Sequence, residues 1–160
     1  AGQGTVGFEL LEQIPDMDYI FSSIGGGGLV SGIGQVLKGH KSKVKVIAGQ
    51  ASGCSSMVDS LKLGKIKTIE NASTFADGIR VKNVSPDMFK LLQEVVDTSS
   101  KVDDEKMAWA ILQLMEKARV IAEGAGALPL ALLDQLYKIN PKKFKGKKIV
   151  QRFQFLKTGA

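Results

Sequence analysis

Four consecutive glycines, Gly25 to Gly28, follow a short apolar run and constrain the fold more than any other stretch. Residues 19–24 predict a buried strand, and residues 29–38 predict an amphipathic helix. A glycine run is costly inside either element, because glycine loses the most backbone entropy on folding. Between a strand and a helix, the same run presents bare N–H groups at the helix N-terminus, which attracts anions. We therefore predict a phosphate-binding loop at residues 25–28.

The rest of the sequence alternates between helical and strand patterns. We expect further strands at 44–47, 101–102 and 149–150, and further helices at 8–13, 57–63, 86–96, 107–118 and 124–136. Residues 68–81 read as irregular, with a turn at 74–78. This alternation predicts an α/β fold, a three-layer arrangement in which helices flank both faces of a parallel sheet.

The helix expected at 107–118 has the clearest periodicity in the sequence. Asp103 or Asp104 is placed to cap its N-terminus. Apolar residues then recur at intervals of three and four. We interpret Met107 and Trp109 as core-packing residues of this helix, not as part of a ligand-binding cluster.

Composition and charge exclude several classes of protein. The chain has 160 residues and one cysteine, Cys54, so it has no internal disulfide framework and suits a reducing compartment. No apolar run approaches the ~18 residues of a membrane span. The net charge of +6 arises at the C-terminus, where no acidic residue follows Asp134. Because no aromatic platform accompanies these basic residues, we interpret them as a solvated loop, not a nucleic-acid site.

The segment from Gly2 to Gly7 matches the pattern G-x-G-x-x-G of dinucleotide-binding loops. That loop requires a strand before it and an acid at a strand end to bind the ribose. No strand pattern precedes Gly2, and Ser22 and Ser23 stand where the acid is needed. Both requirements are unmet, which argues against a nucleotide site here. A nicotinamide-dependent enzyme that uses Gly2, Gly4 and Gly7 is kept only as an alternative hypothesis.

Four other residues carry chemistry that could belong to a site. His40 is the only histidine and lies at a predicted helix end, so we expect it to be exposed, with neither a zinc site nor a catalytic triad. Cys54 lies among small residues and reads as incidental. Asp77 and Glu123 lie in glycine-flanked turns of the kind that carry function, although each could also be a cap or a surface acid.

Four motifs together resemble those of the fold-type II pyridoxal-phosphate enzymes. They are Ala1-Gly2-Gln3-Gly4-Thr5, Gly25-Gly26-Gly27-Gly28-Leu29, Thr74-Phe75-Ala76-Asp77-Gly78 and Glu123-Gly124-Ala125-Gly126-Ala127. Their order and spacing are most similar to those of the threonine/serine dehydratases, also called ammonia-lyases, and next to those of serine racemase. The resemblance covers nearly all of residues 1–150 and implies that they form part of the large, cofactor-binding domain.

This resemblance implies both a cofactor site and a reaction. The cofactor phosphate would be held by the backbone N–H groups of Gly25, Gly26, Gly27, Gly28 and Leu29. Glu123 would lie near the ring of pyridoxal phosphate. L-threonine or L-serine would lose its α-proton and its β-hydroxyl, and the enamine product would hydrolyse to a 2-oxo acid and ammonia. A serine racemase-like enzyme, or a non-catalytic fragment that keeps only the phosphate loop, remains an alternative.

Several features depart from the family pattern. The family's Schiff-base lysine and its substrate-binding asparagine loop lie upstream of these residues, so we expect no catalytic residue and no small domain in this chain. The family's serine-glycine-glycine-asparagine turn is replaced by an atypical tail at 151–160. Relatives that bind a divalent cation use a glutamate and an aspartate where Gln50 and Ser56 stand here, so we expect no metal site.

The resemblance also implies how the parent protein works in the cell. We expect a small-molecule amino-acid substrate, no nucleic-acid or membrane partner, and a homo-oligomer of the full-length parent. The expected location is the cytoplasm, or an organelle such as the mitochondrion or plastid if the parent carries a transit peptide.

Overall fold

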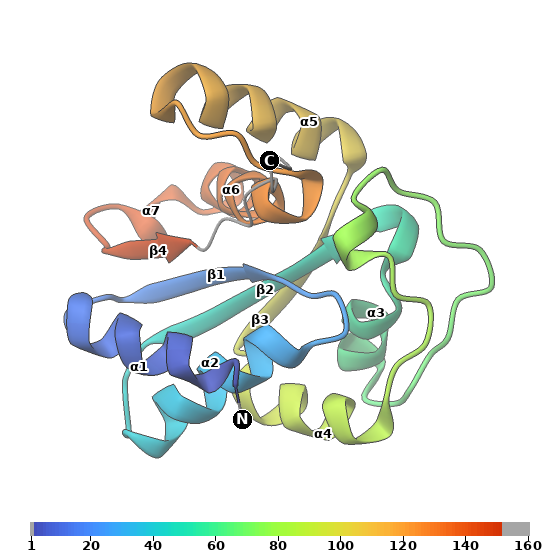
Figure 1. The fold of residues 1–160 in the computed structure, drawn as a ribbon, viewed down its shortest axis with the longest axis horizontal. Helices are drawn as coiled ribbons and strands as arrows, with labels where there is room; N and C mark the ends of the chain where they lie inside the picture. Colours follow the sequence, from blue (N-terminus) through green and yellow to red (C-terminus); the bar gives the residue numbers. More distant parts are fainter. Residues whose placement is uncertain (1, 152–160) are drawn as a thin grey trace, which may run out of the picture.

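The computed structural model, which describes residues 2–151, contains a four-stranded parallel sheet in the order β3-β2-β1-β4 (Figure 1). The strands are β1 (Tyr19–Ser23), β2 (Lys45–Ala51), β3 (Thr98–Val102) and β4 (Ile149–Gln151). All three strand pairs are parallel. The predicted α/β fold is confirmed.

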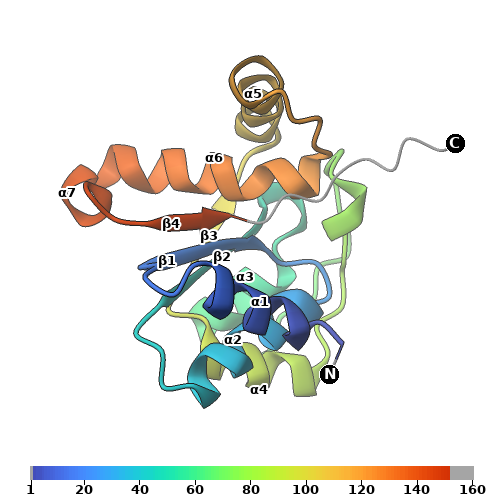
Figure 2. The same ribbon diagram turned by 60° about the vertical axis from the view of Figure 1, so that its left-hand side comes forward.

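Helices cover both faces of this sheet, which gives the three layers that the alternating pattern predicts. One layer holds α1 (Gly4–Gln13), α2 (Gly28–Gly39), α3 (Ser56–Leu63) and α4 (Pro86–Val95). The other layer holds α5 (Asp104–Gln113), α6 (Gly124–Ile139) and α7 (Pro141–Phe144). Figure 2 shows the sheet nearly edge-on between these two layers. Within the described residues, no helix is both long and apolar enough to cross a membrane.

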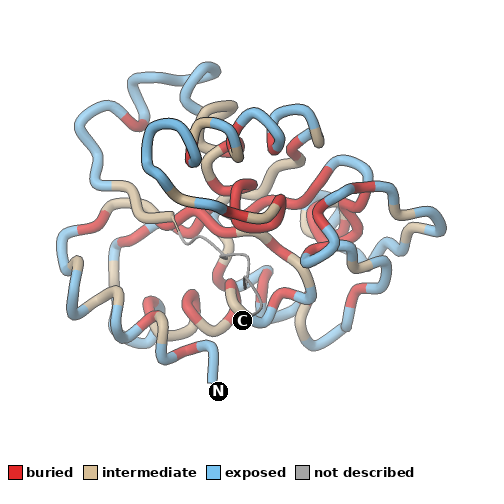
Figure 3. Tube along the Cα trace, turned by 45° about the horizontal axis from the view of Figure 1, so that its top comes forward, coloured by how far each residue is buried: buried red, intermediate tan, exposed pale blue. Residues whose placement is uncertain are grey.

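The core has two halves because successive side chains of a strand point to opposite faces of the sheet. Ile20 and Val46 pack against the layer of α1 to α4. Phe21 and Ile47 pack against the layer of α5 and α6. Figure 3 shows the buried residues concentrated between the layers. Burial of each such side chain stabilises the fold by about 1.5 to 3 kcal/mol.

Strand β1 marks the point where the winding of the sheet changes direction. It is hydrogen-bonded to β2 on one side and to β4 on the other. The chain moves outward from β1 through β2 to β3, and then returns along the opposite face to β4. Open α/β sheets bind ligands at the carboxyl ends of the strands beside such a switch point. The loop at residues 25–28 leaves β1 at this place.

Several details differ from the predictions made from the sequence. Helix α1 begins at Gly4 instead of at residue 8, and strand β2 continues to Ala51 instead of ending at residue 47. Strand β3 begins at Thr98 instead of at residue 101. Helix α5 ends at Gln113 and is followed by a π-helical turn, Leu114–Ala118. The prediction that Trp109 is a core residue is wrong, because its side chain is 39% exposed. Met107, which is buried, takes the inward face of α5; Trp109 falls on the opposite face because two residues turn the helix by about 200°.

The C-terminal end of the described chain is strand β4, which pairs Ile149 with Tyr19 and Gln151 with Phe21. Gln151, the first residue of the predicted tail, therefore belongs to the sheet. Residues 152–160, the rest of that tail, lie outside the described residues.

Candidate functional site

The glycine loop connects the carboxyl end of β1 to the N-terminus of α2. Gly27 is the N-cap residue, with a φ of +89°, and no side chain caps this helix N-terminus. The first turn of α2 holds no acidic residue. The first N–H groups of a helix have no acceptor within the helix, and the helix dipole adds about half a positive charge at this end. The loop therefore has the geometry and the electrostatics of an anion site.

The four glycines of the loop have two different surroundings. A Cβ on Gly25 would lie 3.0 Å from the carbonyl oxygen of Gly78, and a Cβ on Gly27 would lie 2.6 Å from Cγ of Met88. These two glycines permit close packing. A Cβ on Gly26 or on Gly28 would meet no atom of residues 2–151 within 4 Å. At these two positions the backbone faces open space that a ligand can occupy.

Leu29 continues the loop into the first turn of α2. Its side chain is half-buried and packs against the core on the α1 to α4 side of the sheet. This packing anchors the start of α2, whose backbone N–H groups include that of Leu29. The side chain thus helps to hold the helix N-terminus in place, and any contact with an anion would come from the backbone.

The turn at Thr74–Gly78 is held by Asp104, the first residue of α5. The hydroxyl of Thr74 donates to Oδ1 of Asp104 at 2.8 Å, and the N–H of Phe75 donates to Oδ2 at 3.1 Å. Sequence reasoning treated Asp104 only as a possible helix cap, and no local signal links it to a turn 30 residues away. Asp77 in the same turn is 76% exposed and pairs with Arg80 at 2.9 Å, which is the arrangement of a surface acid.

Glu123 is the N-cap residue of α6, and its side chain is half-buried. Its Oε1 atom is buried and has no hydrogen-bond partner among the described residues. A Cβ on Gly78 would lie 3.1 Å from this atom. A buried carboxylate oxygen without a donor is unfavourable by about 1 to 3 kcal/mol or more. Glu123 therefore offers a free acceptor to a ligand that carries a hydrogen-bond donor.

The structure brings the glycine loop and Glu123 together through the turn that contains Gly78. Gly25 lies against the carbonyl group of Gly78, and Glu123 lies against its Cα. The phosphate of pyridoxal phosphate fits the uncapped N-terminus of α2. A donor elsewhere on the cofactor or substrate fits Oε1 of Glu123. The donor set is thus compatible with the predicted cofactor.

Two of the three glycines of the G-x-G-x-x-G segment serve helix packing. Gly4 and Gly7 lie in α1, and a Cβ on Gly7 would be 2.8 Å from Cβ of Val36 in α2. On the other side, a Cβ on Gly32 of α2 would be 2.9 Å from the backbone nitrogen of Gly4. Since these glycines face a neighbouring helix and not a strand-to-helix turn, the dinucleotide hypothesis has no geometric support.

Two other candidate residues lie away from the loop. His40 is exposed, as predicted, and its Nδ1 lies 2.9 Å from the carbonyl oxygen of Val36. Cys54 is fully buried. Burial raises the pKa of the Cys54 thiol. A buried thiol with a raised pKa is a poor nucleophile, which argues against a catalytic role for Cys54.

A glycine loop that opens a helix at a sheet switch point defines the class of anion-binding α/β proteins. Comparison with known proteins narrows this class. Residues 1–151 match the family described as "Pyridoxal-phosphate dependent enzyme". The chain belongs to this family.

Relatives of known sequence and structure support the assignment. The chain is 42% identical to an L-threonine ammonia-lyase of Thermotoga maritima over 149 residues, which is 93% of this chain and 36% of the relative. It superimposes with a TM-score of 0.89 on a threonine deaminase of Solanum lycopersicum, at 32% identity, with 96% of this chain and 44% of that chain covered. The TM-score with a serine racemase of Dictyostelium discoideum is 0.85, at 30% identity, with 99% and 50% covered. The chain thus spans about a third of the length of the curated relative.

Proposed function

We propose that this chain is the cofactor-binding part of an enzyme that deaminates L-threonine or L-serine. The observation that carries the proposal is the placement of Gly25 and Glu123 against the same residue, Gly78. It puts an anion site and an unpartnered carboxylate oxygen side by side. The similarity to proteins named L-threonine ammonia-lyase and threonine deaminase supports this choice of reaction.

The residues of the site take two roles in this proposal. The phosphate is held by the backbone N–H groups of Gly25, Gly26, Gly27, Gly28 and Leu29. Glu123 accepts a hydrogen bond through Oε1 and stays close to the reacting centre. When bound, pyridoxal phosphate supplies an electron sink for the charge that develops at the α-carbon. For threonine, loss of water and hydrolysis of the resulting enamine yield 2-oxobutanoate and ammonia.

We place the catalytic lysine of this enzyme outside residues 1–160. The chain spans 36% of the length of the Thermotoga maritima relative. The resemblance places the Schiff-base lysine upstream, and residues 1–24, which precede the glycine loop, contain no lysine. By this proposal, residues 1–150 are the cofactor-binding portion of the large domain. The isolated chain then holds the cofactor without converting the substrate.

A small-molecule amino-acid substrate, processed by a homo-oligomer, also belongs to this proposal. The charges near the C-terminus support it over a nucleic-acid partner. Lys147 pairs with Asp18 at 2.9 Å, and Lys148 pairs with Asp16. These lysines are thus balanced locally by acidic residues that are distant in sequence.

The proposal is tested with the purified protein that contains this segment, supplied with pyridoxal phosphate and L-threonine or L-serine. We expect 2-oxobutanoate from threonine, pyruvate from serine, and equimolar ammonia. Formation of D-serine without ammonia would instead assign the racemase alternative, and cofactor binding without any product would assign the non-catalytic one. We expect no product from the 160-residue chain alone, and 2-oxobutanoate formation by it would contradict the placement of the lysine.

A further inference from the structure

We propose that direct hydrogen bonds replace a divalent cation behind the site: Gln50 binds the backbone of α3, and Cys54 and Ser56 bind the carbonyl group of Val81. The family resemblance implies such a cation for relatives with a glutamate and an aspartate at positions 50 and 56. The residues of this chain do not fit it. The inference concerns what positions the site, and it holds whether the reaction is deamination or racemisation.

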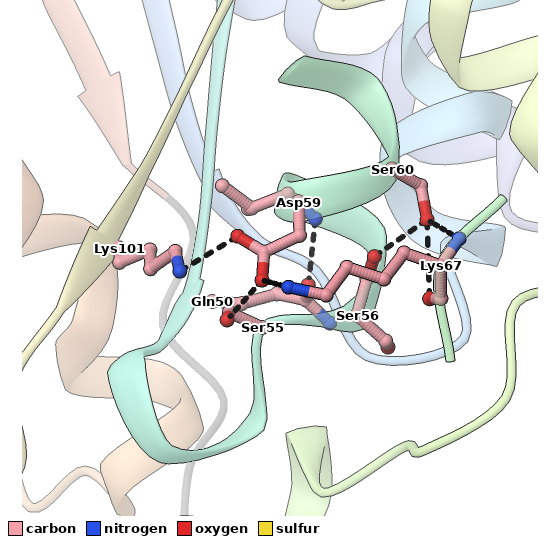
Figure 4. Close-up of polar contacts among 8 residues, drawn as sticks. Gln50, Ser55, Ser56, Asp59, Ser60, Lys67 and Lys101 are labelled. Carbon is pink, nitrogen blue, oxygen red and sulfur yellow. Dashed lines mark hydrogen bonds and ion pairs between the residues drawn. The ribbon is translucent and has the colours of Figure 1, made fainter. Parts of the chain in front are cut away.

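The first observation is the orientation of the Gln50 side-chain amide. Gln50 lies in β2 and is 0% exposed. Its Oε1 accepts the N–H of Val58 at 2.9 Å (Figure 4). A flipped amide would set its NH₂ group against that N–H donor, so the orientation is determined. The Nε2 atom of the amide is buried and has no hydrogen-bond partner among the described residues. Because this NH₂ group donates hydrogen bonds and does not accept them, it cannot serve as a ligand to a cation.

The second observation is that two side chains converge on one backbone carbonyl group. Oγ of Ser56 donates to the carbonyl oxygen of Val81 at 2.9 Å, and Sγ of Cys54 donates to the same oxygen at 3.4 Å. The N–H of Val81 in turn donates to the carbonyl oxygen of Ile79 at 2.9 Å. A Cβ on Gly25 would be 3.5 Å from Cα of Ile79. The hydroxyl of Ser56 is therefore used to fix the segment that borders the glycine loop.

The third observation is the charge around the N-terminus of α3. Asp59, one turn into this helix, is the acidic residue of its first turn. Its carboxylate already binds Lys101 at 2.6 Å and Lys67 at 3.2 Å, and it accepts a hydrogen bond from Ser55 at 3.3 Å (Figure 4). Two lysines on one carboxylate leave a net positive charge, and the helix dipole adds to it. This field disfavours a divalent cation.

The decisive experiment measures the response of the cofactor-loaded protein to Mn²⁺. The melting temperature is recorded in EDTA and in excess Mn²⁺, and bound Mn²⁺ is counted by electron paramagnetic resonance. We expect the same melting temperature in both and no bound Mn²⁺. Stoichiometric binding of Mn²⁺ at this site, removed by Gln50→Ala, would overturn the proposal.

A double substitution tests whether Gln50 and Ser56 are the reason that this chain binds no divalent cation where its relatives do. The double variant Gln50→Glu/Ser56→Asp should melt about 5 °C or more lower in EDTA, because it buries two carboxylates, and recover with Mn²⁺. Gln93→Glu adds a carboxylate on the exposed side of α4 and should respond to neither. A folded double variant that gains no response to Mn²⁺ would count against the assignment.

A milder variant keeps the test valid if the double variant does not fold. Ser56→Ala removes the bond to Val81, and we expect about tenfold weaker binding of pyridoxal phosphate, which Mn²⁺ does not restore. Ser56→Thr keeps the hydroxyl and should recover the affinity. Equal affinity of the alanine variant and the unmodified protein would show that Ser56 does not position the site.

Discussion

The carbonyl oxygen of Gly78 lies 3.0 Å from the place that a Cβ on Gly25 would take. Gly78 is also the residue whose own Cβ would lie 3.1 Å from Oε1 of Glu123. One turn therefore sets the distance between the glycine loop and the buried carboxylate. Because some glycines of the loop face packed atoms and others face open space, substitutions there separate stability from ligand binding.

Gly26→Ala should weaken cofactor binding and leave the fold intact. A methyl group at this position meets no atom within 4 Å in the part of the chain that the structure describes, so we expect a stability change below about 0.5 kcal/mol. The same methyl group would enter the space of the phosphate and lower the affinity for pyridoxal phosphate about tenfold or more. Absorbance titration gives the affinity. Gly39→Ala is the control, because Gly39 also faces open space but lies at the far end of α2. Equal affinities of the two variants for pyridoxal phosphate would show that residues 25–28 do not bind the phosphate.

Gly27→Ala should destabilise the fold by about 2 to 4 kcal/mol, because a left-handed backbone and a clash act together. The φ angle is +89°, and the new Cβ would be 2.6 Å from Cγ of Met88. Gly64→Ala isolates the first effect, since Gly64 has a φ of +69° and no atom within 4 Å. We expect a loss of only about 1 to 2 kcal/mol there. Urea unfolding measures the stability of both variants. Equal losses of stability in Gly27→Ala and Gly64→Ala would exclude a contribution from the clash with Met88.

Glu123→Gln should weaken the binding of pyridoxal phosphate about tenfold, because a neutral amide oxygen is a weaker acceptor than a carboxylate. The melting temperature of the cofactor-free protein should not fall, since Oε1 has no partner to lose among residues 2–151. Glu116→Gln, at an exposed position in the π-helical turn, serves as the control. If Glu123→Gln lowers the melting temperature but not the affinity, the residue is structural and not part of the site.

Asp59→Asn should reduce stability at neutral pH and should make the stability change less as the pH is lowered into the acidic range. Burial raises the pKa of the Asp59 carboxyl, but the bonds from Lys101 and Lys67 outweigh burial and hold the pKa below its ordinary value of 3.8. The stabilisation is therefore complete above pH 3.8 and is lost as the pH falls through the lower folded-state pKa. At neutral pH we expect the free energy of unfolding of Asp59→Asn to be lower than that of the unmodified protein by about 1 to 2 kcal/mol. We expect no larger loss, because both lysines are partly exposed and solvent weakens their attraction to the carboxylate.

Urea unfolding of both proteins between neutral pH and acid measures this difference. The gap between the unmodified protein and Asp59→Asn should close as the pH drops below the ordinary value of 3.8. Asp16→Asn is the control, because the Asp16 carboxylate is 69% exposed in its pair with Lys148. A gap that stays constant across this range would mean that the charge of Asp59 does not stabilise the fold.

Local patterns predicted most of the secondary structure and the position of the glycine loop between β1 and α2. A strand, a glycine run and a helix are adjacent in sequence, so their order alone places backbone N–H groups at a helix N-terminus. Periodicity likewise predicted the core role of Met107, which is fully buried. The same pattern placed Trp109 in the core by mistake, because Trp109 has apolar neighbours in the sequence. Its exposure depends on which face of α5 packs against α6, and this is decided only in the folded protein.

The sequence by itself determined the α/β class, the family motifs and the loop at residues 25–28, because each depends on residue types that are close together in the chain. Only the tertiary structure decided that Asp104 accepts hydrogen bonds from the turn at Thr74–Gly78. It also decided that Oε1 of Glu123 lies beside Gly78 without a hydrogen-bond partner in the described part of the chain. These relationships join residues tens of positions apart. They exist only because the sheet and its two helical layers bring those segments into contact.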